Sequence, residues 1–459
     1  MLSRVAESGV GSSWFARPKR YVGSRPFPDR APGTDSIPEI GHIVVLMMEN
    51  HSYDNYLGLL ERGDGLEKDD RGDVVASNMT SQGRKVVAKH MLSTTQHPKV
   101  PSQSWAATHE QWAGGRNDGF VRSAEEQGQR VDPRVAMDFW NEEDLPFYYG
   151  LARVFPVADR WFSSCLGPTF PNRRFLISGT ANGLISDELS RTLDRPENGT
   201  IFDLLDKYGI SWANYHCVSH TQPVATRVLG VHGLRFGRLI GGFLKPWVSK
   251  LRSVTENAKS SLQFTADCYP LGLFGYLRHV KSVDRFISDA AAGKLPAVSI
   301  VDPDFHHNSE ENPQDIQKGE AFAARIINAV MHGAGWSKTL LIWVYDEHGG
   351  YYDHVAPPAA PQPDDRLPED GGMSRFDRYG FRVPAVIVSP FAKVNYISHQ
   401  VHDHTSILKL IETKWNLPPL TRRDANADNL LDSLDLTRPP SFIVPPELPS
   451  PAIQALRRP

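Results

Sequence analysis

The stretch that decides the fold is TLLIWVYDEHGGYYDHV, residues 339–355. It begins with a run of large and β-branched apolar residues, 340–345, which is typical of a strand buried on both faces of a sheet. Asp346 and Glu347 follow directly, and a pair of glycines then turns the chain. Two adjacent carboxylates at the end of a buried strand are costly unless a positive group faces them. A bound cation would satisfy both carboxylates, whereas a following helix N-terminus or an arginine is the structural alternative.

Four other apolar runs show the same pattern of a strand followed by a polar residue. They span residues 42–48, 155–158, 297–301 and 383–388, and they lead into Glu49, Asp159, Asp302 and Ser389. Apolar residues recur at helical spacing in residues 319–331, between two of the runs, and in residues 405–414, after the last run. Strands that alternate with helices predict an α/β fold with a mostly parallel central sheet flanked by helices. Ligands bind at the carboxyl ends of the strands in such a sheet, so the acids that follow the strands mark the candidate site.

The composition is that of an ordinary globular protein. The chain has 459 residues, of which 40% are hydrophobic and 22% charged, and its net charge is -3. This charge provides no general basic field for nucleic acid. Three scattered cysteines show neither a metal-binding spacing nor a disulfide framework. Neither a secretory signal nor a run of about 20 apolar residues is found, so we expect a cytoplasmic or peripheral membrane protein.

The domain organisation predicted from the sequence is simple. Residues 1–38 are rich in proline, glycine and arginine and predict an N-terminal arm, and residues 441–459 predict a proline-rich tail. Residues 39–440 run without a linker break and predict a single domain. Within it, residues 221–260 combine basic with bulky apolar side chains. They are interpreted as a segment for peripheral contact with a membrane, or as a lid insertion packed on the core.

A further candidate lies in LGPTFPNRRFLISGT, residues 166–180. Pro171 suits the first turn of a helix, which places Thr169 at the helix N-terminus. Backbone N–H groups at that position favour an anion such as phosphate. The Thr169 hydroxyl becomes a nucleophile only if a metal or a base lowers its pKa. The alternative is that Thr169 simply caps the helix, as threonine often does.

Four motifs in order resemble a known family. They are ENHSYDNYLG (residues 49–58), GPTFPNR (167–173), DEHGGYYDHV (346–355) and DHTSILKLIE (403–412). Together they resemble the phosphoesterase family of bacterial and plant non-specific phospholipases C and related acid phosphatases. The resemblance covers residues 42 to 415 and makes residues 39–440 a single phosphoesterase catalytic domain. It also implies an alkaline-phosphatase-like three-layer sandwich.

The resemblance implies a metal site and a nucleophile. It assigns one divalent metal ion to Glu49, Asn50, Asp346 and Glu347, with Thr169 as the nucleophile and a further ligand. Carboxylate, amide and hydroxyl oxygens suit calcium, magnesium or manganese, and the choice among them stays open.

Histidines are the expected proton donors to the leaving group. The candidates are His306, His307 and His404, and the sequence does not decide which of the adjacent pair acts. The residues expected to bind the substrate are Asn172, Arg173, His109 and Gln103. Gln103 stands before Ser-Trp, where many relatives have a histidine.

The function implied is that of a metal-dependent, phospholipase C-like hydrolase. It would cleave a glycerophospholipid to diacylglycerol and a phosphorylated head group through a phosphothreonine intermediate. A broad-specificity acid phosphatase is the close alternative, because the same core serves both reactions. A non-catalytic phosphate- or lipid-binding protein is the alternative from another class. A sulfatase is less consistent with the sequence, because sulfatases of this fold use a modified cysteine or serine, and Thr169 is neither.

Overall fold

A computed structural model describes residues 23–97, 101–126, 132–187, 195–217, 277–370, 372 and 374–455. Within this part, a mixed eight-stranded sheet has the strand order β10-β4-β9-β8-β1-β7-β5-β6. Its strands are β1 His42–Met48, β4 Val157–Ala158, β5 Trp212–His216, β6 Val280–Ser282, β7 Val298–Val301, β8 Thr339–Tyr345, β9 Ala385–Val388 and β10 Ile397–Ser398. A separate antiparallel pair joins β2 Ser77–Met79 to β3 Lys85–Val87.

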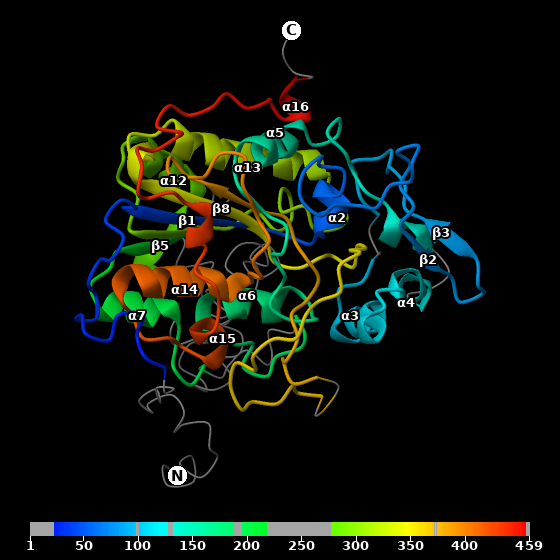
Figure 1. The fold of residues 1–459 in the computed structure, drawn as a ribbon, viewed down its shortest axis with the longest axis horizontal. Coiled ribbons are helices and arrows are strands. Elements are labelled where there is room, and N and C mark those ends of the chain that lie inside the picture. The colour runs from blue at the N-terminus through cyan, green and yellow to red at the C-terminus, as the bar shows by residue number, and fades with distance from the viewer. Residues whose placement is uncertain are drawn as a thin grey trace, which may run out of the picture.

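Helices cover both faces of this sheet, and α3 and α4 lie beside the β2-β3 pair (Figure 1). The helices of the described residues are α2 Tyr53–Leu57, α3 Trp105–Trp112, α4 Phe120–Glu126, α5 Pro146–Val154, α6 Thr169–Ser178, α7 Ile201–Lys207, α12 Val283–Ala291, α13 Ile316–Met331, α14 His404–Trp415, α15 Arg422–Ala425 and α16 Ala452–Ala455. Helices α5, α12 and α13 lie on one side of the sheet, and α6, α7 and α14 lie on the other (Figure 1). The predicted α/β fold, a mostly parallel sheet between two helical layers, is confirmed.

The two central strands explain where the site lies. Every residue of β8 is buried, and so are the last six residues of β1, as their apolar runs predicted. The two strands are parallel and in register, with Met48 opposite Tyr345. Consequently Glu49 and Asp346 leave the sheet side by side. Strand β7 is also parallel to β1, so Asp302 emerges at the same edge.

The direction of strand β9 differs from the sequence prediction. The sequence predicts that Ser389 lies at the same edge of the sheet as the other polar strand ends. In the structure β9 runs antiparallel to β8, with Val388 opposite Leu341. Ser389 therefore lies towards the opposite edge of the sheet. The reason is that the long connection from residue 346 to residue 384 stays at the carboxyl edge of β8, so the chain enters β9 from there. Arg382, which precedes β9, then comes to that edge instead.

Parts of the predicted arm and tail pack on the domain. Gly33 donates its backbone N–H to the carbonyl of Trp415 over 2.8 Å, and Lys414 forms an ion pair with Asp35. In the tail, the carbonyl of Phe442 accepts a hydrogen bond of 2.8 Å from the indole of Trp336.

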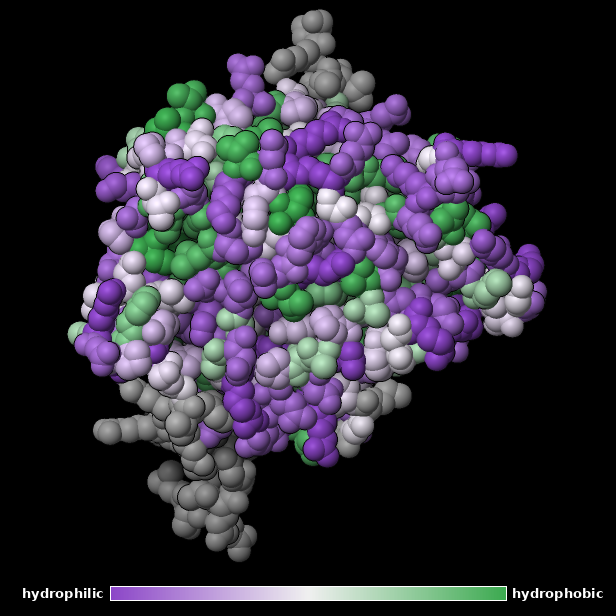
Figure 2. Space-filling view, viewed as in Figure 1, coloured by the Kyte–Doolittle hydropathy of each residue, from purple (hydrophilic) through white to green (hydrophobic). Residues whose placement is uncertain are grey.

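The surface that Figure 2 shows is mostly polar, with apolar side chains in small separate patches. Among the described residues, no helix combines the length and the apolar character that crossing a membrane requires. The basic and aromatic segment predicted at residues 221–260 lies outside the described residues.

Candidate active site

Three carboxylates from the ends of β1, β7 and β8 surround one arginine from α6. The guanidinium of Arg173 lies 2.9 Å from Glu49 Oε1, 3.0 Å from Asp302 Oδ1 and 3.0 Å from Asp346 Oδ2. All four side chains are buried, with at most 1% of their surface exposed. The parallel register places the acids together, and Arg173 reaches them from α6, which lies in the helical layer on one side of the sheet.

Among the described residues, the acids of this cluster outnumber the guanidinium that faces them. Glu347 adds a fourth buried carboxylate to the one guanidinium. Burial, followed by the charge of Asp346, raises the pKa of both Glu49 and Glu347 well above the usual range, although Arg173 acts against this at Glu49. Within the described part of the chain, Oε1 of Glu347 is buried without a hydrogen-bond partner. A bound cation would satisfy this oxygen and offset the excess negative charge.

Asn50 and Thr169 bring two neutral oxygen donors to the same place. The hydroxyl of Thr169 donates a hydrogen bond of 3.4 Å to Asn50 Oδ1, and the N–H of Asn50 donates to Asp346 Oδ1 over 3.1 Å. Asn50 has a φ of 67°, a left-handed conformation that asparagine tolerates better than most residues. Gly349 is required beside it, because a Cβ there would lie 1.9 Å from the Asn50 carbonyl oxygen. The donor set of carboxylates, amide and hydroxyl fits a hard divalent cation.

Thr169 is the first residue of α6, and the segment around it is fixed from two sides. The side chain of Asn172 accepts from the N–H of Cys165 over 3.0 Å and donates to the carbonyl of Gly167 over 2.8 Å, which holds the turn before the helix. The N–H of Phe170, next to Thr169, donates to Asp187 Oδ1 over 2.9 Å. A carboxylate oxygen therefore occupies a position at the helix N-terminus that an anionic phosphate oxygen would also suit.

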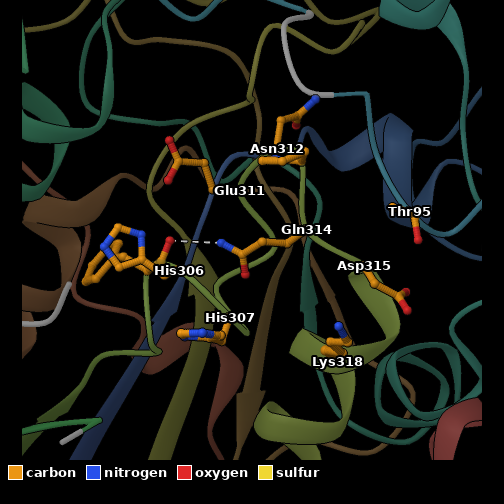
Figure 3. Close-up of a pocket in the computed structure, with 10 residues that line it drawn as sticks. Thr95, His306, His307, Glu311, Asn312, Gln314, Asp315 and Lys318 are labelled. Carbon is orange, nitrogen blue, oxygen red and sulfur yellow. Dashed lines mark hydrogen bonds between the residues drawn. The ribbon is translucent and has the colours of Figure 1, made fainter. Parts of the chain in front are cut away.

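A cavity of about 430 Å³ lies near this cluster (Figure 3). Its lining is formed by Thr95, Phe305, His306, His307, Glu311, Asn312, Pro313, Gln314, Asp315 and Lys318. The ring of Phe305 is stacked on Arg173 at 4.9 Å, which links the cavity to the acidic cluster. Burial, then the charges of Asp346 and Asp187, raise the pKa of Glu311 to about 7, with Arg173 opposing.

The candidate histidines fall into two environments. His306 and His307 are exposed on the turn after β7, and Nδ1 of His307 lies 3.1 Å from Asp304. His404, in contrast, is buried at the start of α14. Its Nε2 donates to the carbonyl of Asp346 over 2.6 Å, and its Nδ1 accepts from the indole of Trp161 over 3.4 Å. Both ring nitrogens of His404 are thus used within the protein.

His109 and Gln103 lie on or beside α3, next to the turn that precedes Thr169. Nδ1 of His109 donates to the carbonyl of Trp105 over 2.7 Å, and burial lowers the pKa of this histidine. Gln103 is half-buried just before the helix. The helix borders the turn directly, because a Cβ at Gly167 would lie 3.1 Å from the Trp105 ring.

The sequence marks Asp302 only as an acid that follows an apolar strand, like Glu49 and Asp346, and assigns it no role. Two further residues of this site were missed altogether. Asp187 and Glu311 lie in irregular segments, where neither periodicity nor a motif marks them. Their proximity to the cluster depends on tertiary folding.

A second buried charge network lies where the chain enters β9. Arg382 forms ion pairs of 2.9 Å with Asp54 and 2.8 Å with Asp353. His354 lies 2.7 Å from Asp54 and 3.2 Å from Asp64. Burial alone would lower the pKa of His354, but the hydrogen bond and charge of Asp54, together with the charge of Asp353, raise it to about 9.

We expect His354→Gln to destabilise the protein in a pH-dependent way. The histidine pKa is about 9 in the folded protein and near 6.5 when unfolded, so its stabilisation is fully present below about pH 6.5 and is lost as the pH rises through 9. Urea unfolding should show a loss of about 2 kcal/mol at pH 6 and less than about 1 kcal/mol at pH 10. An equal loss at both pH values would contradict the charged state of His354.

Comparisons with known proteins identify the family of this chain. A family model described as the Phosphoesterase family matches residues 40–418. Phospholipase C B of Mycobacterium tuberculosis (strain ATCC 25618 / H37Rv) is 31% identical over 460 residues, covering 91% of this chain and 82% of that protein. Non-specific phospholipase C3 of Arabidopsis thaliana is 27% identical over 452 residues, covering 91% and 78%. A solved structure of an alkaline phosphatase superfamily protein from Vibrio parahaemolyticus overlays with a TM-score of 0.38 at 9% identity, covering 93% and 78%.

Proposed function

Since the chain belongs to the Phosphoesterase family, we propose that it is a phospholipase C-like enzyme that uses Thr169 as its nucleophile. Membership makes the chain a hydrolase of phosphoric esters. The proposed substrate is a glycerophospholipid, cleaved to diacylglycerol and a phosphorylated head group. The observation that carries the proposal is the hydroxyl of Thr169, which lies at the start of α6 and contacts Asn50 beside the strand-end acids.

A divalent cation fits these residues, because a buried carboxylate oxygen of Glu347 has no hydrogen-bond partner among the described residues. The proposed ligands are Glu49, Asn50, Thr169, Asp346 and Glu347. When bound, the cation would lower the pKa of the Thr169 hydroxyl and offset negative charge on the phosphate.

The proposed reaction has two displacements at phosphorus. The Thr169 hydroxyl first loses its proton to solvent, its oxygen forms a bond to phosphorus, and the bond from phosphorus to the diacylglycerol oxygen breaks. The leaving oxygen takes a proton from His306 or His307, which are exposed at the wall of the cavity. A water molecule then attacks the phosphothreonine, which releases the phosphorylated head group and restores the Thr169 hydroxyl.

The contacts of three expected site residues support positioning roles. Arg173 is engaged by three carboxylates, so we assign it to holding the acidic residues rather than to the substrate. Asn172 shapes the turn before Thr169 through its hydrogen bonds to Cys165 and Gly167. His404 supports the backbone of Asp346, which keeps that carboxylate in place.

The test compares two chromogenic substrates, a phosphocholine diester and a phosphomonoester, with chelator-treated protein. We expect negligible hydrolysis without added ion, and recovery of diester hydrolysis on titration with calcium, magnesium or manganese. Short-chain phosphatidylcholine should then yield diacylglycerol.

Recovery of monoester hydrolysis alone would contradict the proposed phospholipase C activity and would assign an acid phosphatase activity to the chain. Undiminished hydrolysis after complete removal of divalent ions would contradict the metal assignment. Silence on both substrates would support the binding-protein alternative.

A further inference from the structure

We propose that a second divalent cation, of the zinc class, binds outside the active site to His402, Asp428 and Asp432. One ligand atom from each of these side chains lies within 4.8 Å of the other two. The side chain of His402 is fully buried, whereas those of Asp428 and Asp432 are 37% and 20% exposed. The three residues join the segment between β10 and α14 to the short 3-10 helix η6, Leu431–Ser433. One side of the cluster is therefore anchored in the fold, and the other is open to water.

The hydrogen bonds around His402 fix which ring nitrogen is free. The hydroxyl of Ser398 donates its single proton to Asp432 Oδ2. The Ser398 oxygen then accepts from Nε2–H of His402, 3.1 Å away. The neutral imidazole consequently carries a lone pair on Nδ1, which is buried and has no hydrogen-bond partner among the described residues.

A carboxylate lies close to this free nitrogen, which is an unfavourable arrangement without a cation. Nδ1 of His402 lies 3.9 Å from Oδ1 of Asp428, so the two atoms are too far apart for a hydrogen bond. A lone pair facing a negatively charged oxygen is repulsive, and a metal ion between them turns both atoms into ligands. Histidines that bind metals commonly donate their other N–H to a neighbouring acceptor, as His402 does to Ser398.

The spacing and the donors favour an ion of the zinc class. Donor atoms of a tetrahedral zinc site are about 3.4 Å apart, so the observed 3.9 Å needs a contraction of a few tenths of an ångström. One imidazole and two carboxylates suit zinc better than calcium, which takes six to eight oxygen ligands. The exposed side leaves a fourth position for water.

The site would tie η6 to the segment that carries the start of α14. The backbone of His402 is already held by Arg160 and Phe162, with hydrogen bonds of 3.0 and 2.8 Å. His404, which supports Asp346, follows two residues later. An ion bound only by the folded chain stabilises it by mass action.

The test measures zinc binding to the chelator-treated full-length chain by calorimetry, with native mass spectrometry for stoichiometry. We expect Asp428→Asn and Asp432→Asn each to lower zinc affinity at this site at least tenfold and to abolish the rise in Tm that zinc causes. The matched control is Asp435→Asn, because Asp435 lies three residues beyond Asp432 and is 30% exposed. Its zinc binding should equal that of the wild type.

These variants distinguish zinc binding at His402, Asp428 and Asp432 from cation binding at the active site. Loss of one bound ion in Asp428→Asn, with the wild type binding either one or two, supports the proposal whether or not the active site binds metal. Cobalt in place of zinc should give a visible absorption band in the wild type that Asp428→Asn lacks. The proposal would be overturned if Asp428→Asn and Asp432→Asn had the same zinc affinity and the same zinc-induced rise in Tm as Asp435→Asn and the wild type.

Discussion

Replacing Thr169 with alanine is expected to reduce kcat for the phosphodiester by a factor on the order of 10⁴ or more. The hydroxyl of this residue donates a 3.4 Å hydrogen bond to Asn50, which lies beside the strand-end acids. Its removal deletes the attacking oxygen and one oxygen donor, while α6 keeps its remaining contacts. The measurement is steady-state hydrolysis with the divalent ion that activates the wild type.

Two controls make this result specific. Thr169→Ser keeps the hydroxyl and should retain activity within about tenfold of the wild type, because only a methyl group is lost. A Tm for Thr169→Ala close to that of the wild type would show that the fold is intact. Turnover of Thr169→Ala within tenfold of the wild type would eliminate threonine as the nucleophile.

Replacing Arg173 with methionine is expected to lower the free energy of unfolding of the metal-free protein by about 3–5 kcal/mol. Arg173 is the shared partner of Glu49, Asp302 and Asp346, and all of them are buried. Without the guanidinium, their charges remain buried and lose their common partner, so the acids must take up protons or separate. Urea unfolding followed by circular dichroism measures the loss.

The matched control is Arg160→Met, which removes an ion pair with Asp64. The Arg160 side chain is 29% exposed, and a pair of this kind contributes at most about 1 kcal/mol. Divalent ions should restore part of the stability lost in Arg173→Met and none of that lost in Arg160→Met, because only the first change leaves uncompensated acids at the proposed metal site. Equal losses in the two variants would contradict the central role of Arg173.

Much of the fold could be predicted because its central strands are almost entirely buried. The runs in β1 and β8 contain little but apolar residues, so their type and bounds are evident without tertiary information. The direction of β9 could not be predicted in the same way. Strand direction depends on the path of the 346–384 connection, which has no periodic pattern.

Some residues of the site could be predicted from the sequence, whereas the contacts of others could not. Glu49 and Asp346 follow buried strands, and parallel pairing brings such residues together. The contacts of Arg173 could not be predicted from the sequence, because they depend on how α6 packs relative to the strand ends. The cluster at His402 depends on a tertiary contact between segments about 30 residues apart, for which the sequence has no metal-binding spacing.

The measurement that tests the central claim most directly is mass spectrometry of protein quenched in acid during turnover of a phosphodiester. A phosphothreonine withstands acid, so the adduct survives the quench. If Thr169 is the nucleophile, we expect a phosphoryl group, bearing the head group of the substrate, on the peptide that carries Thr169. The same peptide from Thr169→Ala should carry none. An unmodified Thr169 peptide from an actively turning over enzyme, or an adduct on another residue such as His306 or His307, would contradict the account.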